Sequence, residues 1–281
     1  MQRIVYRDTL NFLRKLSGRK IYNAALVVVS YYLSRWTRRP RQWGLPFTIN
    51  YEPNTAFILR CPECPSGLRQ FSRPTGNLKS DFFRANLDQL AEHLLYLIFY
   101  FQGEPYINPA FLDMVSHAND KGIYTITSTN GHFLNDANAK ATIESGLDRL
   151  IISIDGSTQE TYEQYRKEGK LEAVLQGVRN VVKWKRQLKA ATPHIVLQFL
   201  VVRPNEHQIP EIQQMAKELG VDALSFKTAQ VYDYEHGNPL IPEDERLSRY
   251  RQLPDGRYEP KANLHDHCWK LWHGAVITWD G

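Results

Sequence analysis

Residues 96–131 read YLIFYFQGEPYINPAFLDMVSHANDKGIYTITSTNG, and this stretch decides the fold class. It contains an apolar run at 96–101, a helical pattern at 109–121 and a second apolar run at 123–128. Two short apolar runs joined by a helix of this length are typical of parallel strands with a right-handed crossover. The stretch therefore predicts an α/β fold built on a parallel sheet.

The same alternation of short apolar runs and helical stretches covers residues 47–229. We predict strands at 47–51, 96–101, 123–128, 150–153, 195–201 and 223–227. We predict the intervening helices at 81–94, 109–121, 136–145, 159–189 and 206–219. Because each helix is long enough for a crossover connection, the six units are expected to form an incomplete parallel barrel, a partial (β/α)6 barrel.

A basic N-terminal arm precedes this region. Residues 1–46 hold ten Lys or Arg against a single acid, Asp8, while the rest of the chain holds 25 basic and 29 acidic residues. The arm is predicted to form two amphipathic helices up to residue 39 and to pack against the barrel or a partner. Anchoring at a membrane surface is the less favoured alternative. The mildly acidic main body argues against nucleic-acid binding.

Composition narrows the class of protein further. An apolar content of 42% in 281 residues is enough for a large core. No stretch approaches the roughly 20 uninterrupted apolar residues that span a bilayer, and residues 1–20 do not resemble a secretory signal. The three cysteines, Cys61, Cys64 and Cys268, suit metal or redox chemistry better than a disulfide framework. We therefore expect a cytoplasmic protein.

Polar and glycine-containing motifs follow three of the predicted strands. Gly103 and Glu104 come after the second strand, Asn130 after the third, and Ser153 and Asp155 at the end of the fourth. In parallel β/α folds the carboxyl ends of the strands form the ligand face, so these residues are expected to converge there. The alternative is that they are ordinary turn and cap residues, because Asn, Asp and Gly after a strand often mark only a turn.

Cys61 and Cys64 lie in the loop after the first strand, which belongs to the same face. Three thiolates from a C-x-x-x-C-x-x-C loop hold three irons of a 4Fe-4S cluster and leave the fourth iron free for another ligand. Here Phe57 occupies the first position of that spacing, and phenylalanine offers no lone pair to iron. Buried apolar cysteines or half of a zinc site are the alternatives for this pair.

Residues 47–281 resemble the radical SAM enzymes. The resemblance rests on the cysteine loop, on Gly103-Glu104-Pro105 and on the polar residues after the third and fourth strands. The resemblance implies a 4Fe-4S cluster and S-adenosyl-L-methionine (SAM) as cofactors, with Cys61 and Cys64 as metal ligands. It also implies reductive cleavage of SAM, with an electron donor of the flavodoxin or ferredoxin type as a partner.

The resemblance implies which residues bind the amino group and the carboxylate of the methionine moiety of SAM. Gly103 and Glu104 match the motif that holds the amino group. Arg166, within Tyr162-x-x-Tyr165-Arg166-x-x-Gly169, resembles the arginine that pairs with the carboxylate. A carboxylate beside an ammonium is the expected chemistry. The alternative for Arg166 is a solvated charge on a helix.

The resemblance also implies which residues bind the nucleoside of SAM. Ser153 and Asp155 match positions that bind the ribose hydroxyls, and Asn130 is expected to face the same cavity. Leu200 and Val201 on the fifth strand are candidates for packing on adenine, although core packing is the commoner use of such residues.

The end of the chain shows a second resemblance. Cys268, followed by two tryptophans and by Trp279-Asp280-Gly281, resembles the opening of a SPASM domain, which implies that Cys268 is a ligand of an auxiliary cluster. We expect residues 230–281 to be a connection and the truncated start of that domain. We also expect Trp269, Trp272 and Trp279 to lack part of their packing partner, and the chain to be an incomplete version of a longer protein.

Three functions remain open from the sequence. The first is a radical SAM/SPASM protein that cleaves SAM to modify a peptide or other substrate. The second is a degenerate barrel that has lost cluster chemistry through Phe57 and serves as a scaffold. The third is a zinc-binding interaction module that recruits His265, His267 and Cys268. If the chain is a radical SAM/SPASM protein, a peptide or protein is the first expectation for its substrate. Analogy of fold alone is a weak argument for a substrate.

Overall fold

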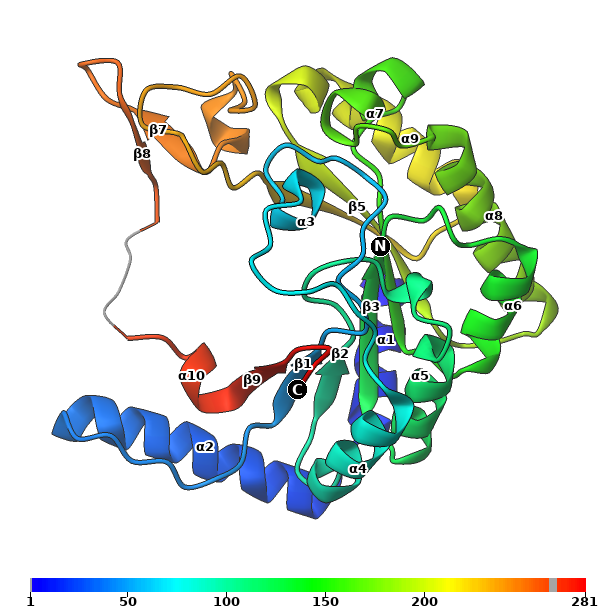
Figure 1. The fold of residues 1–281 in the computed structure, drawn as a ribbon, viewed down its shortest axis with the longest axis vertical. Coiled ribbons are helices and arrows are strands. Elements are labelled where there is room, and N and C mark those ends of the chain that lie inside the picture. Colours follow the sequence, from blue (N-terminus) through cyan, green and yellow to red (C-terminus); the bar gives the residue numbers. More distant parts are fainter. Residues whose placement is uncertain (1, 263–266) are drawn as a thin grey trace.

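The computed structural model describes residues 2–262 and 267–281, with a curved seven-stranded sheet at the centre (Figure 1). The strand order is β6-β5-β4-β3-β2-β1-β9, and every neighbouring pair is parallel. The strands are β1 (Thr48–Tyr51), β2 (Tyr96–Ile98), β3 (Tyr124–Thr129), β4 (Arg149–Ser153), β5 (His194–Val201), β6 (Ala223–Thr228) and β9 (Gly274–Ile277). The sheet does not close, so the predicted partial barrel is confirmed.

All six predicted strands are present, but the sequence analysis missed the seventh. β9 pairs with β1 in parallel, with Thr48 opposite Gly274 and Tyr51 opposite Ile277. The strand is only four residues long, which is too short for its alternation of side chains to be recognised in the sequence. The connection before it also lacks a crossover helix of the usual length. Residues 274–277 thus complete the sheet edge beside β1.

Helices cover the outer face of the sheet (Figure 1). They are α4 (Ser80–Leu90), α5 (Phe111–Asp120), α6 (Asp136–Glu144), α7 (Gln159–Tyr165), α8 (Leu171–Gln187) and α9 (Ile209–Leu219). Three short helices, α3 (Pro65–Leu68), η1 (Pro105–Ile107) and η2 (Arg203–Gln208), lie in the connections that follow β1, β2 and β5. The main core lies between this layer and the sheet and includes Phe83, Phe99, Met114, Ile152 and Leu197.

One helix prediction was wrong. The stretch 159–189 is not a single helix, because it breaks between α7 and α8. Glu168 adopts a positive φ of 65° and Gly169 follows it, which is incompatible with a continuing right-handed helix. The break matters for the site, because it places Arg166 at the end of α7 with its side chain directed to the strand ends.

The N-terminal arm is helical and packs on the barrel, as predicted. In α1 (Gln2–Arg14), Asp8 pairs with Tyr124 and Arg149 at the first residues of β3 and β4. Lys15, just after α1, reaches the buried carboxylate of Asp148 at 2.6 Å. This helix therefore covers the amino-terminal ends of the strands, opposite the expected ligand face.

The second arm helix, α2 (Gly18–Thr37), contacts α10 (Lys270–His273) near the end of the chain. Tyr31 of α2 packs edge-to-face on Trp269 and Trp272, with ring centroids 4.7 and 5.4 Å apart. Trp279 donates from Nε1 to Pro74 O at 3.1 Å. These partners come from α2 and the loop after β1, but all three tryptophans stay only half-buried, so the expectation that they lack part of their packing partner stays a prediction.

The remaining segment forms a small unit beside the barrel. It contains η3 (Glu245–Leu247) and an antiparallel hairpin of β7 (Tyr250–Gln252) and β8 (Tyr258–Pro260). In the parts of the chain that the structure describes, we find no helix with the length and apolar character needed to cross a membrane.

Candidate functional site

The loop that carries the two cysteines, residues 52–78, is fixed at both of its ends. Glu52, directly after β1, is fully buried and accepts two hydrogen bonds from Arg73, at 2.6 and 2.5 Å. A bidentate pair of this kind sets orientation as well as energy. Further along, Arg60 contacts Glu168 at 2.9 Å, which ties the loop to the connection between α7 and α8.

Gly103 joins this loop to the end of β2. Its φ is +72°, and a Cβ at this position would lie 2.1 Å from Asn54 O, so only glycine fits. The Gly103 amide donates to Ser66 Oγ at 3.2 Å, and the next amide, of Glu104, donates to Ala56 O at 2.9 Å. The Gly-Glu motif and the cysteine loop are therefore in direct contact.

The Glu104 carboxylate is buried and accepts hydrogen bonds from neighbouring strand ends. Thr129 Oγ1 donates at 2.7 Å, and the Asn130 amide donates at 2.8 Å. The Tyr106 amide lies at 3.3 Å, so Glu104 also caps η1, which is the turn-capping role considered from the sequence. Burial raises the pKa of Glu104 to about 7, although these donors and Arg166 act to lower it. A cation beside this carboxylate would remove much of that burial cost.

Asn130 presents an unused donor at the same place. Its side chain is buried, and its Oδ1 accepts from the His132 amide at 3.0 Å. Its Nδ2 is also buried but finds no acceptor among the described residues. Buried polar groups are nearly always hydrogen-bonded, so this amide nitrogen is available to an acceptor from outside the chain.

Asp155 and Arg166 form a buried ion pair next to the cysteines. Arg166 Nε contacts Asp155 Oδ2 at 2.5 Å, and Arg166 Nη1 lies 3.9 Å from Cys61 Sγ. Asp155 also accepts from the Leu200 amide at 2.8 Å. Ser153 is buried at the end of β4, two residues before Asp155. Arg166 is therefore not a solvated helix charge.

We expect Asp155→Asn to destabilise the fold strongly. The substitution leaves the Arg166 guanidinium in a buried position without its anionic partner, and breaking a buried pair in this way costs about 3–5 kcal/mol of unfolding free energy. Urea denaturation monitored by circular dichroism measures the loss. The exposed pair of Asp244 and Arg246 offers a matched control, and Asp244→Asn should leave the transition midpoint unchanged. Equal midpoints for both variants would contradict a structural role for the buried pair.

Leu200 and Val201 do not share a face of β5. Leu200 packs with the cluster that contains Leu59, Cys61 and Tyr165, on the inner side of the barrel. Val201 instead packs with hydrophobic neighbours under α9 on the outer side. Successive residues of a strand point to opposite faces, so the prediction that both could contact adenine was wrong for Val201.

The cysteine pair does not match the requirement of a three-thiolate cluster. Cys61 is buried and Cys64 is half-buried, and both belong to an apolar cluster against which Phe57 packs. Burial raises the pKa of the Cys61 thiol to about 11, and the nearby Arg166 offsets only part of this. Position 57 is filled by a ring that cannot bind iron. The residues present thus supply two thiolates where the spacing calls for three.

Cys268 is separate from this pair. It is exposed and lies just before α10, which packs on α2 rather than on the cysteine loop. Within residues 2–262 and 267–281, no three His, Cys, Asp or Glu side chains lie close enough to hold a metal ion together. The zinc module that would combine His267 and Cys268 with the cysteine pair therefore has no support, and His265 lies outside the described residues.

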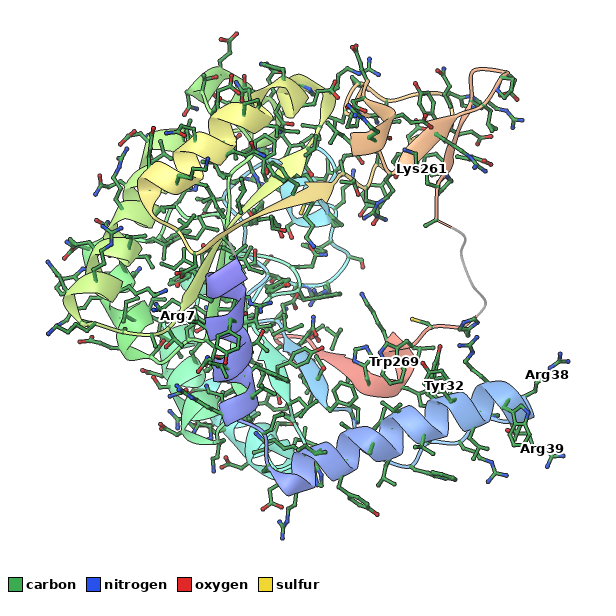
Figure 2. The ribbon with its side chains drawn as sticks, turned by 180° about the vertical axis from the view of Figure 1, so that it is seen from behind. Arg7, Tyr32, Arg38, Arg39, Lys261 and Trp269 are labelled. Atoms are coloured by element: carbon green, nitrogen blue, oxygen red, sulfur yellow. The ribbon has the colours of Figure 1, made fainter. Side chains whose placement is uncertain are left out.

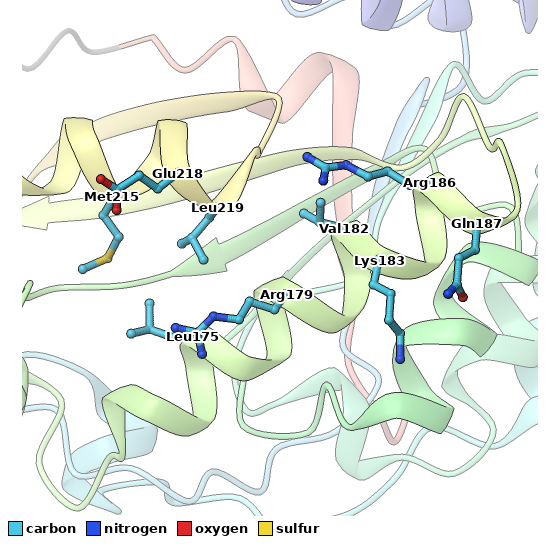
Figure 3. A pocket seen from close by; sticks show the side chains of 9 residues that line it. All are labelled: Leu175, Arg179, Val182, Lys183, Arg186, Gln187, Met215, Glu218 and Leu219. Carbon is cyan, nitrogen blue, oxygen red and sulfur yellow. The ribbon is translucent and has the colours of Figure 1, made fainter.

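A surface pocket of about 740 Å³ lies elsewhere, between α8 and α9 (Figure 3). Its rim includes the basic residues Arg179, Lys183 and Arg186. Arg179 pairs with Glu172, and Lys183 pairs with Asp136. The pocket is on the outer helical layer and its cations are largely neutralised, so it is not the site to which the strand ends point.

Sequence reasoning missed three residues that hold the site together. Ser66 links the cysteine loop to Gly103, Thr129 binds Glu104, and His132 accepts from the Lys170 amide through Nε2 at 2.9 Å. Burial lowers the pKa of His132, which favours its neutral, accepting form. Thr129 and His132 lie within two residues of Asn130 in the sequence, and this was the one feature that could have indicated their part in the site. Nothing in the sequence pattern indicated Ser66.

The comparisons with known proteins agree with this geometry. The family model described as the Radical SAM superfamily matches residues 58–190, which span the cysteine loop to α8. The chain is therefore similar to the radical SAM superfamily over residues 58–190. The match includes Cys61, Glu104, Asp155 and Arg166 within its range, but position 57 precedes it.

Two curated relatives match most of the length of this chain. The PqqA peptide cyclase of Bradyrhizobium diazoefficiens is 28% identical over 220 residues, which are 75% of this chain and 54% of the relative. A tungsten-containing aldehyde ferredoxin oxidoreductase cofactor-modifying protein of Pyrococcus furiosus is 29% identical over 243 residues, which are 79% of this chain and 66% of the relative. The chain thus spans between half and two thirds of the length of these two proteins.

Solved structures share the fold at low sequence identity. Streptococcus suis SuiB bound to S-adenosylmethionine matches with a TM-score of 0.59 at 13% identity, over 77% of this chain and 48% of SuiB. The protein anSMEcpe with bound AdoMet matches with a TM-score of 0.53 at 17% identity, over 68% of this chain and 52% of the other. These likenesses establish the radical SAM type of partial barrel.

Proposed function

We propose that this chain binds SAM at the carboxyl ends of β2 to β5 and belongs to a protein that modifies a peptide. The observation that carries the SAM site is the unpaired, buried Nδ2 of Asn130 beside the buried carboxylate of Glu104. A donor without an acceptor and a carboxylate without a cation are complementary to an amino acid moiety. In this proposal Asp155 and Ser153 serve the ribose, and Arg166 the methionine carboxylate.

The peptide substrate is supported by the relatives. One is a PqqA peptide cyclase, and SuiB bound to its precursor peptide SuiA matches this chain with a TM-score of 0.60 at 12% identity, over 80% of this chain and 48% of SuiB. By extension, we propose a flavodoxin- or ferredoxin-type electron donor and a cytoplasmic location. The SPASM-type assignment of residues 230–281, with Cys268 as an auxiliary ligand, remains part of the proposal.

A second function is favoured by one specific observation, the ring of Phe57 at the first cluster position. A cluster bound at this site would supply the electron for SAM cleavage, and Cys61 and Cys64 are the residues that would contribute to holding it. Because two thiolates do not satisfy the three-cysteine pattern, the chain as it stands would be a SAM-binding barrel with impaired or absent radical chemistry.

Isothermal titration of the protein with SAM, without added iron, tests the binding site independently of the cluster. We expect binding, and we expect Asn130→Asp to weaken it about tenfold, since the substitution keeps the acceptor for the His132 amide but removes the free donor. 5′-Methylthioadenosine, which lacks the amino acid moiety, should bind the wild-type chain more weakly than SAM. No binding of SAM, or equal binding of both ligands, would contradict the proposed site.

A further inference from the structure

The helix α2 is oriented with its polar side toward the protein. The residues that it buries are mostly small or polar, whereas its solvent-facing side is apolar and aromatic. The buried residues are Lys20, Asn23, Val27, Ser30, Tyr31 and Ser34. The large exposed residues are Ile21, Tyr22, Val28, Val29, Tyr32 and Trp36. This is the reverse of the pattern expected for a surface helix of a water-soluble domain.

The buried polar groups of α2 have partners, so the orientation is specific. Asn23 Nδ2 donates to Leu45 O at 2.9 Å, and Asn23 Oδ1 accepts from the Leu45 amide at 2.9 Å. Lys20 Nζ donates to Gly122 O at 2.6 Å. Rotating the helix to bury Val28 and Val29 would break these bonds. The exposed apolar side is therefore a fixed feature of the fold.

The charges carried by α2 and the segment after it are of one sign. Residues 21–34 contain no charged side chain, and no acid occurs anywhere from residue 18 to residue 46. Arg35, Arg38 and Arg39 follow the apolar stretch directly, and no carboxylate of the described residues pairs with Arg38 or Arg39. Figure 2 shows Arg38 and Arg39 at the far end of α2, away from the barrel. An occupant of this face must therefore be apolar with an anionic rim.

We propose that α2 lies in the plane of an anionic phospholipid membrane surface, with its exposed apolar side in the boundary between head groups and acyl chains. Trp and Tyr side chains prefer this depth, and Arg38 and Arg39 would contact the phosphates. The helix does not meet the requirements of a membrane span. From the sequence, packing against the barrel ranked above a membrane surface. In this proposal α2 does both, because one face packs on the protein and the other meets the membrane.

Charge complementarity favours a membrane over a second copy of the chain. A second copy of this face offers no acid between residues 18 and 46 that could pair with Arg38 and Arg39. A bilayer with anionic lipids supplies apolar depth and phosphate charge together. Figure 1 shows α2 at the edge of the molecule, so a flat surface can approach it without passing the strand ends.

Flotation of the full chain with phospholipid vesicles tests the proposal. We expect the chain to float with vesicles of phosphatidylcholine mixed with phosphatidylglycerol, and less with pure phosphatidylcholine or at high salt. Trp36→Ser combined with Val28→Asp should weaken binding tenfold or more. Arg38→Gln and Arg39→Gln should each weaken it about fivefold.

Leu188→Ser provides the matched control, because Leu188 is an exposed apolar residue that follows α8. This variant should float like the wild type. Circular dichroism should show all variants folded, since the altered side chains face solvent. Flotation unaffected by the α2 substitutions would overturn the proposal. So would a failure to float combined with a dimer, detected by light scattering, that Trp36→Ser dissociates, because the face would then be an interface between two copies.

Discussion

Phe57→Cys should convert a chain that loads iron poorly into one that holds a 4Fe-4S cluster. The substitution places a third sulfur at the first position of the C-x-x-x-C-x-x-C spacing with Cys61 and Cys64. Phe57 already lies in the same hydrophobic cluster as both cysteines, so the new thiol arises close to them. Anaerobic reconstitution with iron and sulfide, followed by iron and sulfide analysis, measures the gain. We expect several-fold more iron per chain and, with a reductant, formation of 5′-deoxyadenosine from SAM.

Ile58→Cys is the matched control for this prediction. It adds a cysteine one position away, on a more exposed side chain, and it breaks the spacing. It should load no more iron than the wild type. The wild type and the two variants could instead contain equal amounts of iron and form equal amounts of 5′-deoxyadenosine. Another group would then already serve as the third ligand, and the proposal that Phe57 impairs the cluster site would be wrong.

The iron-free Phe57→Cys variant should also be less stable than the wild type. Phe57 is half-buried against an apolar cluster, so replacing the ring with a small side chain loses roughly 1–2 kcal/mol, less than for a fully buried phenylalanine. Cluster binding should restore stability, because a metal centre that binds only the folded state stabilises it. A cluster-dependent rise in the thermal midpoint therefore separates ligand binding from adventitious iron.

The fold was largely predictable because its signals are local. Each of the six β/α units carries its own apolar run, helix and turn residues, and the positions of Glu104, Asn130 and Asp155 after their strands follow from sequence order alone. β9 was missed because its place beside β1 depends on a long-range pairing. The break at Glu168 was missed because a helical pattern does not reveal a residue with positive φ.

The sequence named residues that meet at the strand ends, but it did not show which of them contact one another. The resemblance assigned Asp155 and Arg166 separately to different parts of SAM, but their mutual contact at 2.5 Å requires the fold of the α7–α8 connection. Helical periodicity likewise gives the two faces of α2. It does not say which face the protein buries, because that depends on the backbone groups to which Asn23 and Lys20 donate. Partners far apart in sequence decide both features.

Glu104 should make SAM binding strongly dependent on pH. In the free protein, burial raises the pKa of Glu104 to about 7, with Arg166 as the charged group that acts against this rise. The ammonium of SAM would favour the ionised carboxylate, so binding lowers this pKa and releases a proton at pH values below it. Affinity should therefore rise as the pH increases through the free-state pKa. Between pH 6.0 and 7.5 we expect about a tenfold gain in affinity.

Titration calorimetry at each pH, in two buffers with different ionisation enthalpies, measures both the affinity and the proton release. Glu104→Gln should bind weakly and lose the pH dependence, whereas Glu104→Asp should bind weakly but retain it, because it keeps the charge. Glu63→Gln is the control: Glu63 lies in the cysteine loop, where its carboxylate accepts from the Tyr232 amide at 2.9 Å, and its loss should leave the pH profile of the wild type in place. A wild-type affinity that stays flat from pH 6.0 to 7.5 would mean that Glu104 does not receive the ammonium, and that its burial serves only the cap of η1 and the link to Thr129.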